Sequence, residues 1–230
     1  MTSIQTNPRN IDDSWIKKFN PENRILTGKS YLFAKRSFDL FCVVLSMPFW
    51  LPFFILVGLA IWIDSPGAPV FFSQDRTGKD GRRFKMMKFR SMVPDAEKLK
   101  GTLAKLNSKG ELAGPLKLEY DPRITRVGRI LRKTSIDELP QILNVLKGEM
   151  SLVGPRPTSW SPESYKLWQT ERLDVPPGIT GLFQIYGRGG TDFDEWLKWD
   201  IRYIERRSFS FDIQILIRTF MVFLKQRGAR

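Results

Sequence analysis

The chain has 230 residues, which is enough for one or two compact domains with a buried core. Its 37 Lys and Arg residues outnumber its 24 Asp and Glu residues, and the formal net charge of +13 favours an anionic partner such as nucleic acid, acidic lipid or a phosphorylated small molecule. The absence of histidine and the single cysteine, Cys42, exclude histidine acid–base catalysis, His-activated nucleophiles, His-ligated metals, intrachain disulfides and cysteine-cluster zinc sites.

Two segments come first in chain order. Residues 1–34 are polar and mixed in charge, lack the apolar core and cleavage site of a secretory signal, and predict a tail of low intrinsic order. Residues 35–66 follow, and their stretch 40–63 carries no charge, whereas about 20 apolar residues suffice to cross a bilayer as a helix. Pro48 and Pro52 lie inside this stretch, and each removes an amide donor, so they predict a break in the helix.

The break leaves two topologies open for the apolar segment. A re-entrant helix hairpin would bend and return to the face that it entered, whereas a kinked helix would cross the bilayer once. Cations flank both ends of the segment, and the positive-inside rule places both ends in the cytoplasm. These cations are Lys35, Arg36, Arg76, Lys79, Arg82 and Arg83.

Residues 67–207 show a mixed α and β pattern. Strands over 69–75 and 83–90 flank Gly78-Lys-Asp-Gly81, which predicts a hairpin across an Asp-Gly turn. Loops rich in Pro and Gly are expected between Pro155 and Gly181. Residues 208–230 begin with an amphipathic helix, which either buries its apolar face in the core or lies in a membrane interface. The helices that apolar spacing predicts cover residues 94–109, 124–133, 137–148, 193–207 and 209–225.

Catalysis is restricted to carboxylates, cations, hydroxyls or a hard metal ion bound by oxygen atoms, and an acidic pair lies at a predicted helix start. If Asp137 is the N-cap, Pro140 falls at N3 and loses no hydrogen bond; if Ser135 caps instead, a capping box with Glu138 forms but Pro140 forfeits one. We favour the first register. A helix start also favours phosphate binding. The alternative is that Asp137 only caps the helix and Glu138 faces water.

Arginines surround the acidic pair in the sequence. Arg123, Arg126, Arg129 and Arg132 recur every three residues, which in a helix gives one cationic ridge directed toward Asp137. Guanidinium groups suit phosphate oxygens, although a solvated basic face or a lipid-headgroup contact also fits. Downstream, two prolines stiffen the backbone around Arg156. Together these features predict a clamp for a diphosphate.

Eight motifs follow one another in a characteristic order. They are Lys35-Arg-Ser-Phe-Asp39, Gln74-Asp-Arg-Thr-Gly78, Phe84-Lys-Met-Met-Lys-Phe-Arg-Ser-Met92, Asp121-Pro-Arg-Ile-Thr-Arg126, Ser135-Ile-Asp-Glu-Leu-Pro-Gln141, Gly148-Glu-Met-Ser151, Gly154-Pro-Arg-Pro157 and Pro177-Gly-Ile-Thr-Gly181. With these motifs the chain resembles the bacterial sugar transferases, the monotopic polyprenyl-phosphate phosphoglycosyl transferases. The resemblance runs from about Lys35 to the C-terminus and predicts a catalytic core without the N-terminal multi-span region of longer members. It departs from the family at the helix break, where Leu51-Pro52 replaces the frequent Ser-Pro pair.

The resemblance implies a specific reaction. Such enzymes move a sugar 1-phosphate from a UDP-sugar to undecaprenyl phosphate and release UMP, as the first membrane step of polysaccharide or glycoconjugate synthesis. Asp137 would attack the β-phosphate and form a phosphosugar-aspartyl intermediate, and Glu138 would handle a proton or hold Mg²⁺ with Asp137. The remaining site residues are phosphate-binding Arg132, Arg156, Arg126, Lys85, Lys88 and Arg90, nucleotide- or sugar-binding Gln184, Arg188 and Thr180, and the membrane break at Pro48 and Pro52.

The resemblance also implies a fold and a location. We expect a mixed α/β fold, mostly helical with a small β-hairpin, in which a re-entrant membrane helix (35–66) joins a cytosolic catalytic domain (67–207) and interfacial amphipathic helices. The enzyme would be monotopic in the bacterial inner membrane and would contact its lipid, with its catalytic domain facing the cytoplasm. No nucleic-acid partner is expected, and a homodimer is compatible with the sequence.

Two other classes of protein compete with this interpretation. A basic peripheral protein that binds anionic lipid or nucleic acid without catalysis would explain the charge, but it needs no acidic pair at a helix start. A structural membrane scaffold would explain the apolar segment, but not an arginine between two prolines. The transferred sugar, the glycan and the oligomeric state stay open.

Overall fold

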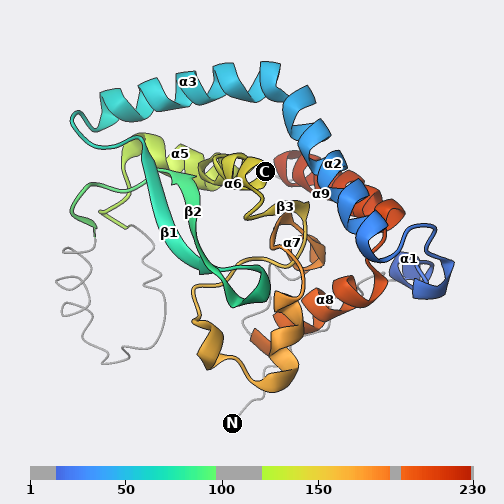
Figure 1. Ribbon diagram of the computed structural model, residues 1–230. Helices are drawn as coiled ribbons and strands as arrows, with labels where there is room; N and C mark the ends of the chain where they lie inside the picture. The colour runs from blue at the N-terminus through green and yellow to red at the C-terminus, as the bar shows by residue number, and fades with distance from the viewer. Residues whose placement is uncertain (1–13, 97–120, 187–192, 229–230) are drawn as a thin grey trace, which may run out of the picture. The chain divides into compact units, whose positions relative to one another are not determined.

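The computed structural model describes residues 14–96, 121–186 and 193–228 (Figure 1). The chain divides into two compact units, which we describe separately. The first contains residues 1–43, 75–84 and 144–230, and the second contains residues 44–74 and 85–143.

Helices and two short parallel strands form the first unit. β3 (Ser151–Val153) pairs with β4 (Gly178–Thr180) in parallel, with Ser151 opposite Gly178. Gly178 is required at this close approach, because a methyl group on it would lie 2.1 Å from the amide nitrogen of Gly154. The helical elements are α1 (Ser14–Lys17), α2 (Gly28–Leu45, whose last two residues belong to the second unit), α7 (Leu182–Tyr186), α8 (Phe193–Arg206), α9 (Phe209–Gly228) and the 3-10 turns η1 (Pro21–Asn23), η4 (Pro162–Ser164) and η5 (Leu167–Leu173).

The prediction of low intrinsic order in residues 1–34 is wrong for residues 14–34. Trp15 and Ile16 of α1 are 5% and 1% exposed, and they belong to the core cluster together with Phe211. Burial of two large apolar side chains stabilises this short segment by more free energy than the ordering of its polar neighbours costs. The average polarity of residues 1–34 did not reveal these two side chains. The helix that contains the apolar segment also begins earlier than predicted, at Gly28.

The polar residues at the start of α2 have protein partners. Lys35 is 8% exposed, and its Nζ lies 2.7 Å from Oδ2 of Asp212, while Tyr203 donates to Oδ1 of the same carboxylate at 2.8 Å. Arg36 donates to the carbonyls of Val145 and Leu146 at the end of α6 (Gln141–Lys147). These cations therefore stabilise the protein as well as flanking the apolar segment.

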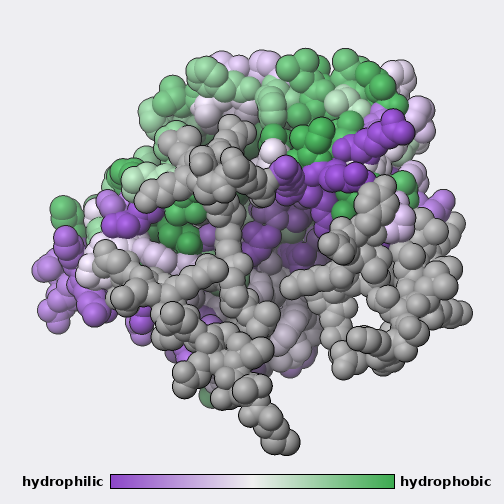
Figure 2. Space-filling view, turned by 180° about the vertical axis from the view of Figure 1, so that it is seen from behind, coloured by the Kyte–Doolittle hydropathy of each residue, from purple (hydrophilic) through white to green (hydrophobic). Residues whose placement is uncertain are grey.

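The second unit contains the helix α3 (Met47–Asp64), which among the described residues is the one helix long and apolar enough to cross a membrane. Its buried face is formed by Trp50, Phe54, Val57 and Ile61, and the Phe54 ring centroid lies 5.1 Å from that of Phe89 in the hairpin. Its other side is exposed and forms much of the green surface at the top of Figure 2. Such a large exposed apolar surface is typical of contact with lipid or protein.

The helix boundary lies at Ser46, which separates α2 from α3. The prediction of a break at Pro48 and Pro52 is therefore inexact. Pro48 occupies the first turn of α3, where an amide has no partner within the helix, so this proline costs nothing. Pro52 lies inside α3, and the helix continues through it. The re-entrant path of the segment stays a prediction.

The hairpin and several helices can be compared with the predictions from the sequence. β1 (Phe71–Thr77) and β2 (Arg83–Phe89) pair as the predicted hairpin, and Asp80 and Gly81 at its turn have φ of 55° and 73°. The predicted helix over 124–133 is confirmed as α5 (Arg126–Thr134), and the two C-terminal helices are confirmed as α8 and α9. The predicted helix over 94–109 lies outside the described residues from residue 97 onward.

Candidate active site

The acidic pair lies in η3 (Ile136–Glu138), one turn of 3-10 helix between α5 and α6. The sequence predicted that Asp137 is the N-cap of an α-helix, and this prediction is wrong, because Asp137 lies inside η3. Ser135 ends α5 in the left-handed conformation, with φ of 56°, and redirects the chain before η3. Pro140 immediately precedes α6, so its missing amide is cheap, as expected, but the helix begins about one turn later than predicted.

Lys88 of β2 forms an ion pair with the second carboxylate of the pair. Its Nζ lies 2.9 Å from Oε1 of Glu138, and the two side chains are 17% and 22% exposed. The partial burial strengthens the interaction relative to an ion pair in bulk water. Of the cations predicted on this strand, Lys88 is thus brought to the acidic pair. Lys85 is exposed and Arg90 is half-buried, and their roles stay predictions.

Asp137 is half-buried, and burial raises the pKa of its carboxyl. The positive charge of Lys88 lowers this pKa, the negative charge of Glu138 raises it, and the positive charge of Arg132 lowers it. Two carboxylates and two cations therefore interact within one small part of the second unit. A carboxylate that is poorly solvated and held near cations suits attack on an anionic phosphoryl group.

The predicted ridge of four arginines is shorter in the structure. Arg123 lies before α5, is 6% exposed, and makes two side-chain hydrogen bonds to Asp121, at 2.9 and 2.7 Å. The helix begins only at Arg126, because the Thr125 hydroxyl accepts the amide of Gly128 at 2.9 Å as its N-cap. The exposed arginines on α5 are Arg126, Arg129 and Arg132.

Arg156 belongs to the first unit, where a buried ion pair holds its backbone. Arg172 donates to the Arg156 carbonyl at 2.5 Å and to Oδ2 of Asp200 at 2.7 Å, and the Arg156 amide hydrogen-bonds to Asp200. Both side chains of the pair are 3% exposed. Arg172 and Asp200 were missed by sequence reasoning, since they lie on η5 and α8 without a motif. They leave the Arg156 side chain half-buried between its two prolines.

The nucleotide- or sugar-binding residues predicted in the first unit differ in their surroundings. Thr180 is buried at the end of β4, and its hydroxyl lies 2.7 Å from that of Thr219. Gln184 on α7 is 6% exposed, and within the described part of the chain both polar atoms of its side chain are buried without a hydrogen-bond partner. An unpaired buried amide is costly and is often a ligand-binding group. Arg188 lies outside the described residues.

Asp137 and Glu138 also fit the modest requirements of Mg²⁺. The described residues contain no group of three or more Asp, Glu or Cys side chains that could hold a metal by themselves. Mg²⁺, however, is usually bound by one or two carboxylates together with substrate phosphates and water. The neighbouring carboxylates of η3 could supply this share of its ligands.

Comparison with known proteins identifies the family. Residues 30–226 match the family model described as Bacterial sugar transferase. The chain belongs to this family. The match covers the acidic pair, Lys88, the arginines of α5 and Arg156, and it confirms the resemblance that the ordered motifs predicted.

Three relatives illustrate the range of the family. The galactosyl transferase CpsE of Streptococcus agalactiae serotype III is 46% identical over 203 residues, which are 87% of this chain and 44% of CpsE. The undecaprenyl-phosphate galactose phosphotransferase of Salmonella typhimurium is 41% identical over 207 residues, 89% of this chain and 43% of the relative. The exopolysaccharide production protein ExoY of Rhizobium meliloti is 37% identical over 199 residues, 85% of this chain and 88% of ExoY. The chain therefore spans less than half the length of the first two relatives.

Proposed function

We propose that this protein transfers a sugar 1-phosphate from a UDP-sugar to undecaprenyl phosphate and releases UMP. The observation that carries the proposal is the half-buried acidic pair of η3, with Lys88 and Arg132 acting on it. The names of the relatives support the acceptor and the reaction class, because one of them is an undecaprenyl-phosphate galactose phosphotransferase. A basic protein that only binds lipid or nucleic acid would have no need for a carboxylate pair held in this way.

The reaction proceeds in two displacements at the same phosphorus atom. In the first, a carboxylate oxygen of Asp137 forms a bond to the β-phosphorus, and the bond from this phosphorus to the bridging oxygen breaks, so that UMP leaves with the bonding electrons. In the second, an oxygen of the lipid phosphate attacks the same phosphorus and the Asp137 carboxylate leaves. The products are UMP and a lipid-linked diphosphate sugar, and Asp137 is regenerated.

Each neighbour of Asp137 has a defined role in this scheme. Arg132 offsets the negative charge of the phosphoryl oxygens while the bond to Asp137 forms. Lys88 holds Glu138, and its charge opposes the rise that burial causes in the pKa of Asp137. Mg²⁺ bound by Asp137 and Glu138 would neutralise part of the diphosphate charge. To Arg156 and Gln184 we assign recognition of the donor, and the roles predicted for Thr180, Arg188, Lys85 and Arg90 are kept as predictions.

The proposed location follows from α3. Its exposed apolar side suits contact with lipid, and the first charge after residues 40–63 is Asp64, at the end of the helix. We place residues 35–66 as a re-entrant segment in the bacterial inner membrane, with the remaining chain on the cytoplasmic side. The relatives named for exopolysaccharide production and galactosyl transfer support a role at the first membrane step of polysaccharide synthesis.

Mass spectrometry of the intact protein tests this function. Purified protein incubated with a panel of UDP-sugars, without lipid, should gain the mass of one phosphosugar on Asp137 and release one equivalent of UMP. Addition of undecaprenyl phosphate should remove the adduct and restore turnover. The Asp137→Asn variant should show neither event, whereas Asp174→Asn, which changes an exposed carboxylate, should behave like the wild type. Turnover by Asp137→Asn at the normal rate would refute the two-step scheme.

A further inference from the structure

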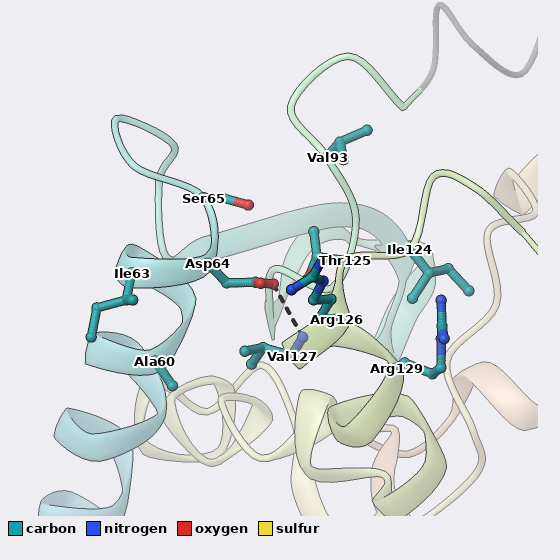
Figure 3. Close-up of a pocket in the computed structure, with 10 residues that line it drawn as sticks. All are labelled: Ala60, Ile63, Asp64, Ser65, Val93, Ile124, Thr125, Arg126, Val127 and Arg129. Atoms are coloured by element: carbon teal, nitrogen blue, oxygen red, sulfur yellow. Dashed lines mark hydrogen bonds between the residues drawn. The ribbon is translucent and has the colours of Figure 1, made fainter.

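A pocket of about 710 Å³ lies in the second unit between the end of α3 and the start of α5 (Figure 3). Ala60 and Ile63 line it from α3, and Arg126 and Arg129 line it from the first turn of α5. The pocket therefore has one apolar wall and one cationic wall. A ligand that matches it has an apolar chain joined to an anionic group.

Asp64 also lines the pocket, and its carboxylate already accepts a backbone hydrogen bond. Its Oδ2 accepts the amide of Val127 at 3.1 Å, as the dashed line in Figure 3 shows. The carboxylate thus caps α5 at the positive end of the helix, next to the Thr125 cap. An anion in the pocket would consequently be bound by the arginine side chains and not by the helix amides.

The pocket also lies where the apolar surface of α3 ends. Leu59, Trp62 and Ile63 are 52%, 56% and 64% exposed, and Asp64 is the first charge after residues 40–63. In a bilayer, such a change from apolar to charged residues falls near the level of the lipid headgroups. A lipid chain lying along this exposed surface would bring its phosphate to Arg126 and Arg129.

We propose that this pocket binds a lipid phosphomonoester, with the phosphate between Arg126 and Arg129 and the chain along α3. A phosphomonoester carries a charge of about −1.5 to −2 at neutral pH, which two guanidinium groups match, whereas the diester of a bilayer phospholipid carries less charge. This inference rests on the proposed function, in which the lipid phosphomonoester is undecaprenyl phosphate, and it assigns a binding site to that acceptor.

The geometry of α5 connects this site with the acidic pair. Arg126, Arg129 and Arg132 follow one another at intervals of three residues along one side of the helix, over about 9 Å of its axis. The last of them acts on Asp137. The pocket thus receives the lipid phosphate, and the arginine row leads from it toward the nucleophile.

Photocrosslinking tests the site without relying on turnover. Cys42 is the only cysteine, so Cys42→Ser with Leu59→Cys allows one benzophenone label on α3, one turn before Ile63 and outside the pocket lining. The labelled protein in detergent micelles is irradiated with undecaprenyl phosphate, with undecaprenol or with phosphatidylglycerol, and adducts are weighed by mass spectrometry. We expect a strong crosslink to undecaprenyl phosphate and little to undecaprenol. Undecaprenyl phosphate should also displace both undecaprenol and phosphatidylglycerol.

Arginine variants identify the groups that hold the phosphate. The double variant Arg126→Gln/Arg129→Gln should lower the crosslink yield by more than about tenfold, because about tenfold is the loss expected for one charged hydrogen-bonding contact. Lys133→Gln, which removes an exposed cation of the same helix outside the pocket lining, should leave the yield unchanged. Equal crosslinking of the three lipids by the wild type, or a yield insensitive to the two arginines in a folded double variant, would overturn the proposal.

The same protein separates this inference from the proposed function. Formation of the phosphosugar adduct on Asp137 needs no lipid, so it reports on the reaction alone. A wild-type protein that captures undecaprenyl phosphate but never forms the adduct or releases UMP would keep the lipid site and refute the chemistry. A protein that forms the adduct but shows no preference for the phosphomonoester would support the chemistry and refute the lipid site.

Discussion

Lys88 and Glu138, 50 residues apart in the chain, form an ion pair with an Nζ–Oε1 distance of 2.9 Å. The charge of Lys88 also acts on Asp137, where it opposes the rise in pKa that burial causes. One lysine of a β-strand thus interacts with both carboxylates of η3. Its position places one positive charge beside both of these neighbouring acids.

Removal of this lysine should move the pH dependence of catalysis. Asp137 must be ionised to attack phosphorus, so activity falls as the pH drops through its raised pKa. Lys88→Met removes a charge that lowers this pKa, and the acidic limb of the kcat/KM profile should therefore shift to higher pH. Lys133→Met, the same change at an exposed position of α5, should leave the limb in place. An unshifted limb in Lys88→Met would contradict the role of Lys88.

Gln184→Leu should have opposite effects on stability and on donor binding. The Gln184 amide is buried and has no hydrogen-bond partner among the described residues, so its replacement by a similar apolar side chain should raise the free energy of unfolding by about 1 kcal/mol. The KM for the UDP-sugar should rise about tenfold if this amide binds the donor. The measurements are chemical denaturation and initial rates.

Gln169 provides the matched control for this substitution. It is 3% exposed, but its Oε1 accepts the amide of Lys166 at 2.8 Å. Gln169→Leu removes that acceptor and should lower the free energy of unfolding. A loss of stability in Gln184→Leu similar to that in Gln169→Leu would show that the Gln184 amide has a partner in the free protein.

The buried pair that holds the Arg156 backbone should make stability depend on pH. Burial raises the pKa of Asp200 to about 7, despite the nearby Arg172. Because the folded state then keeps a proton that the unfolded state has lost, the free energy of unfolding should fall as the pH rises from about 4 to about 7, by at most about 1.4 kcal/mol per pH unit. Asp200→Asn should lack this component, which denaturation at several pH values would reveal. Identical pH dependence in the two proteins would contradict the raised pKa.

Gly128 should not tolerate a side chain, although it lies in a helix. A methyl group on it would lie 2.1 Å from the carbonyl oxygen of Ser91, so Gly128→Ala must displace α5 from that backbone. We expect a loss of stability of about 1–3 kcal/mol and reduced activity, since α5 carries Arg132. In α3, Gly58→Ala would meet only Val70 Cγ1 at 3.5 Å and should be tolerated. Equal midpoints of thermal unfolding for the two variants would argue against this packing.

Several features of this protein could be predicted from its sequence because they depend on neighbouring residues. The hairpin follows from the Asp-Gly turn between two apolar strands, and α5, α8 and α9 follow from helical spacing. The motif around Asp137 identified the family, and the missing histidine restricted the chemistry to other groups. Each of these features depends on interactions between neighbouring residues or on which residue types are present, and both can be determined from the sequence.

The tertiary structure decided which charges meet. The spacing of the arginines predicted that Arg123 lies on a ridge with three others. In the structure Arg123 is buried and hydrogen-bonds to Asp121 instead, because a buried guanidinium group needs an opposite charge. Lys85, Lys88 and Arg90 looked alike on one strand, and only packing brings Lys88 to Glu138. Trp15 likewise occurs in a polar segment, yet it fills the core. Burial changes the strength of every such interaction, and burial depends on residues distant in the chain, so local patterns could not reveal it.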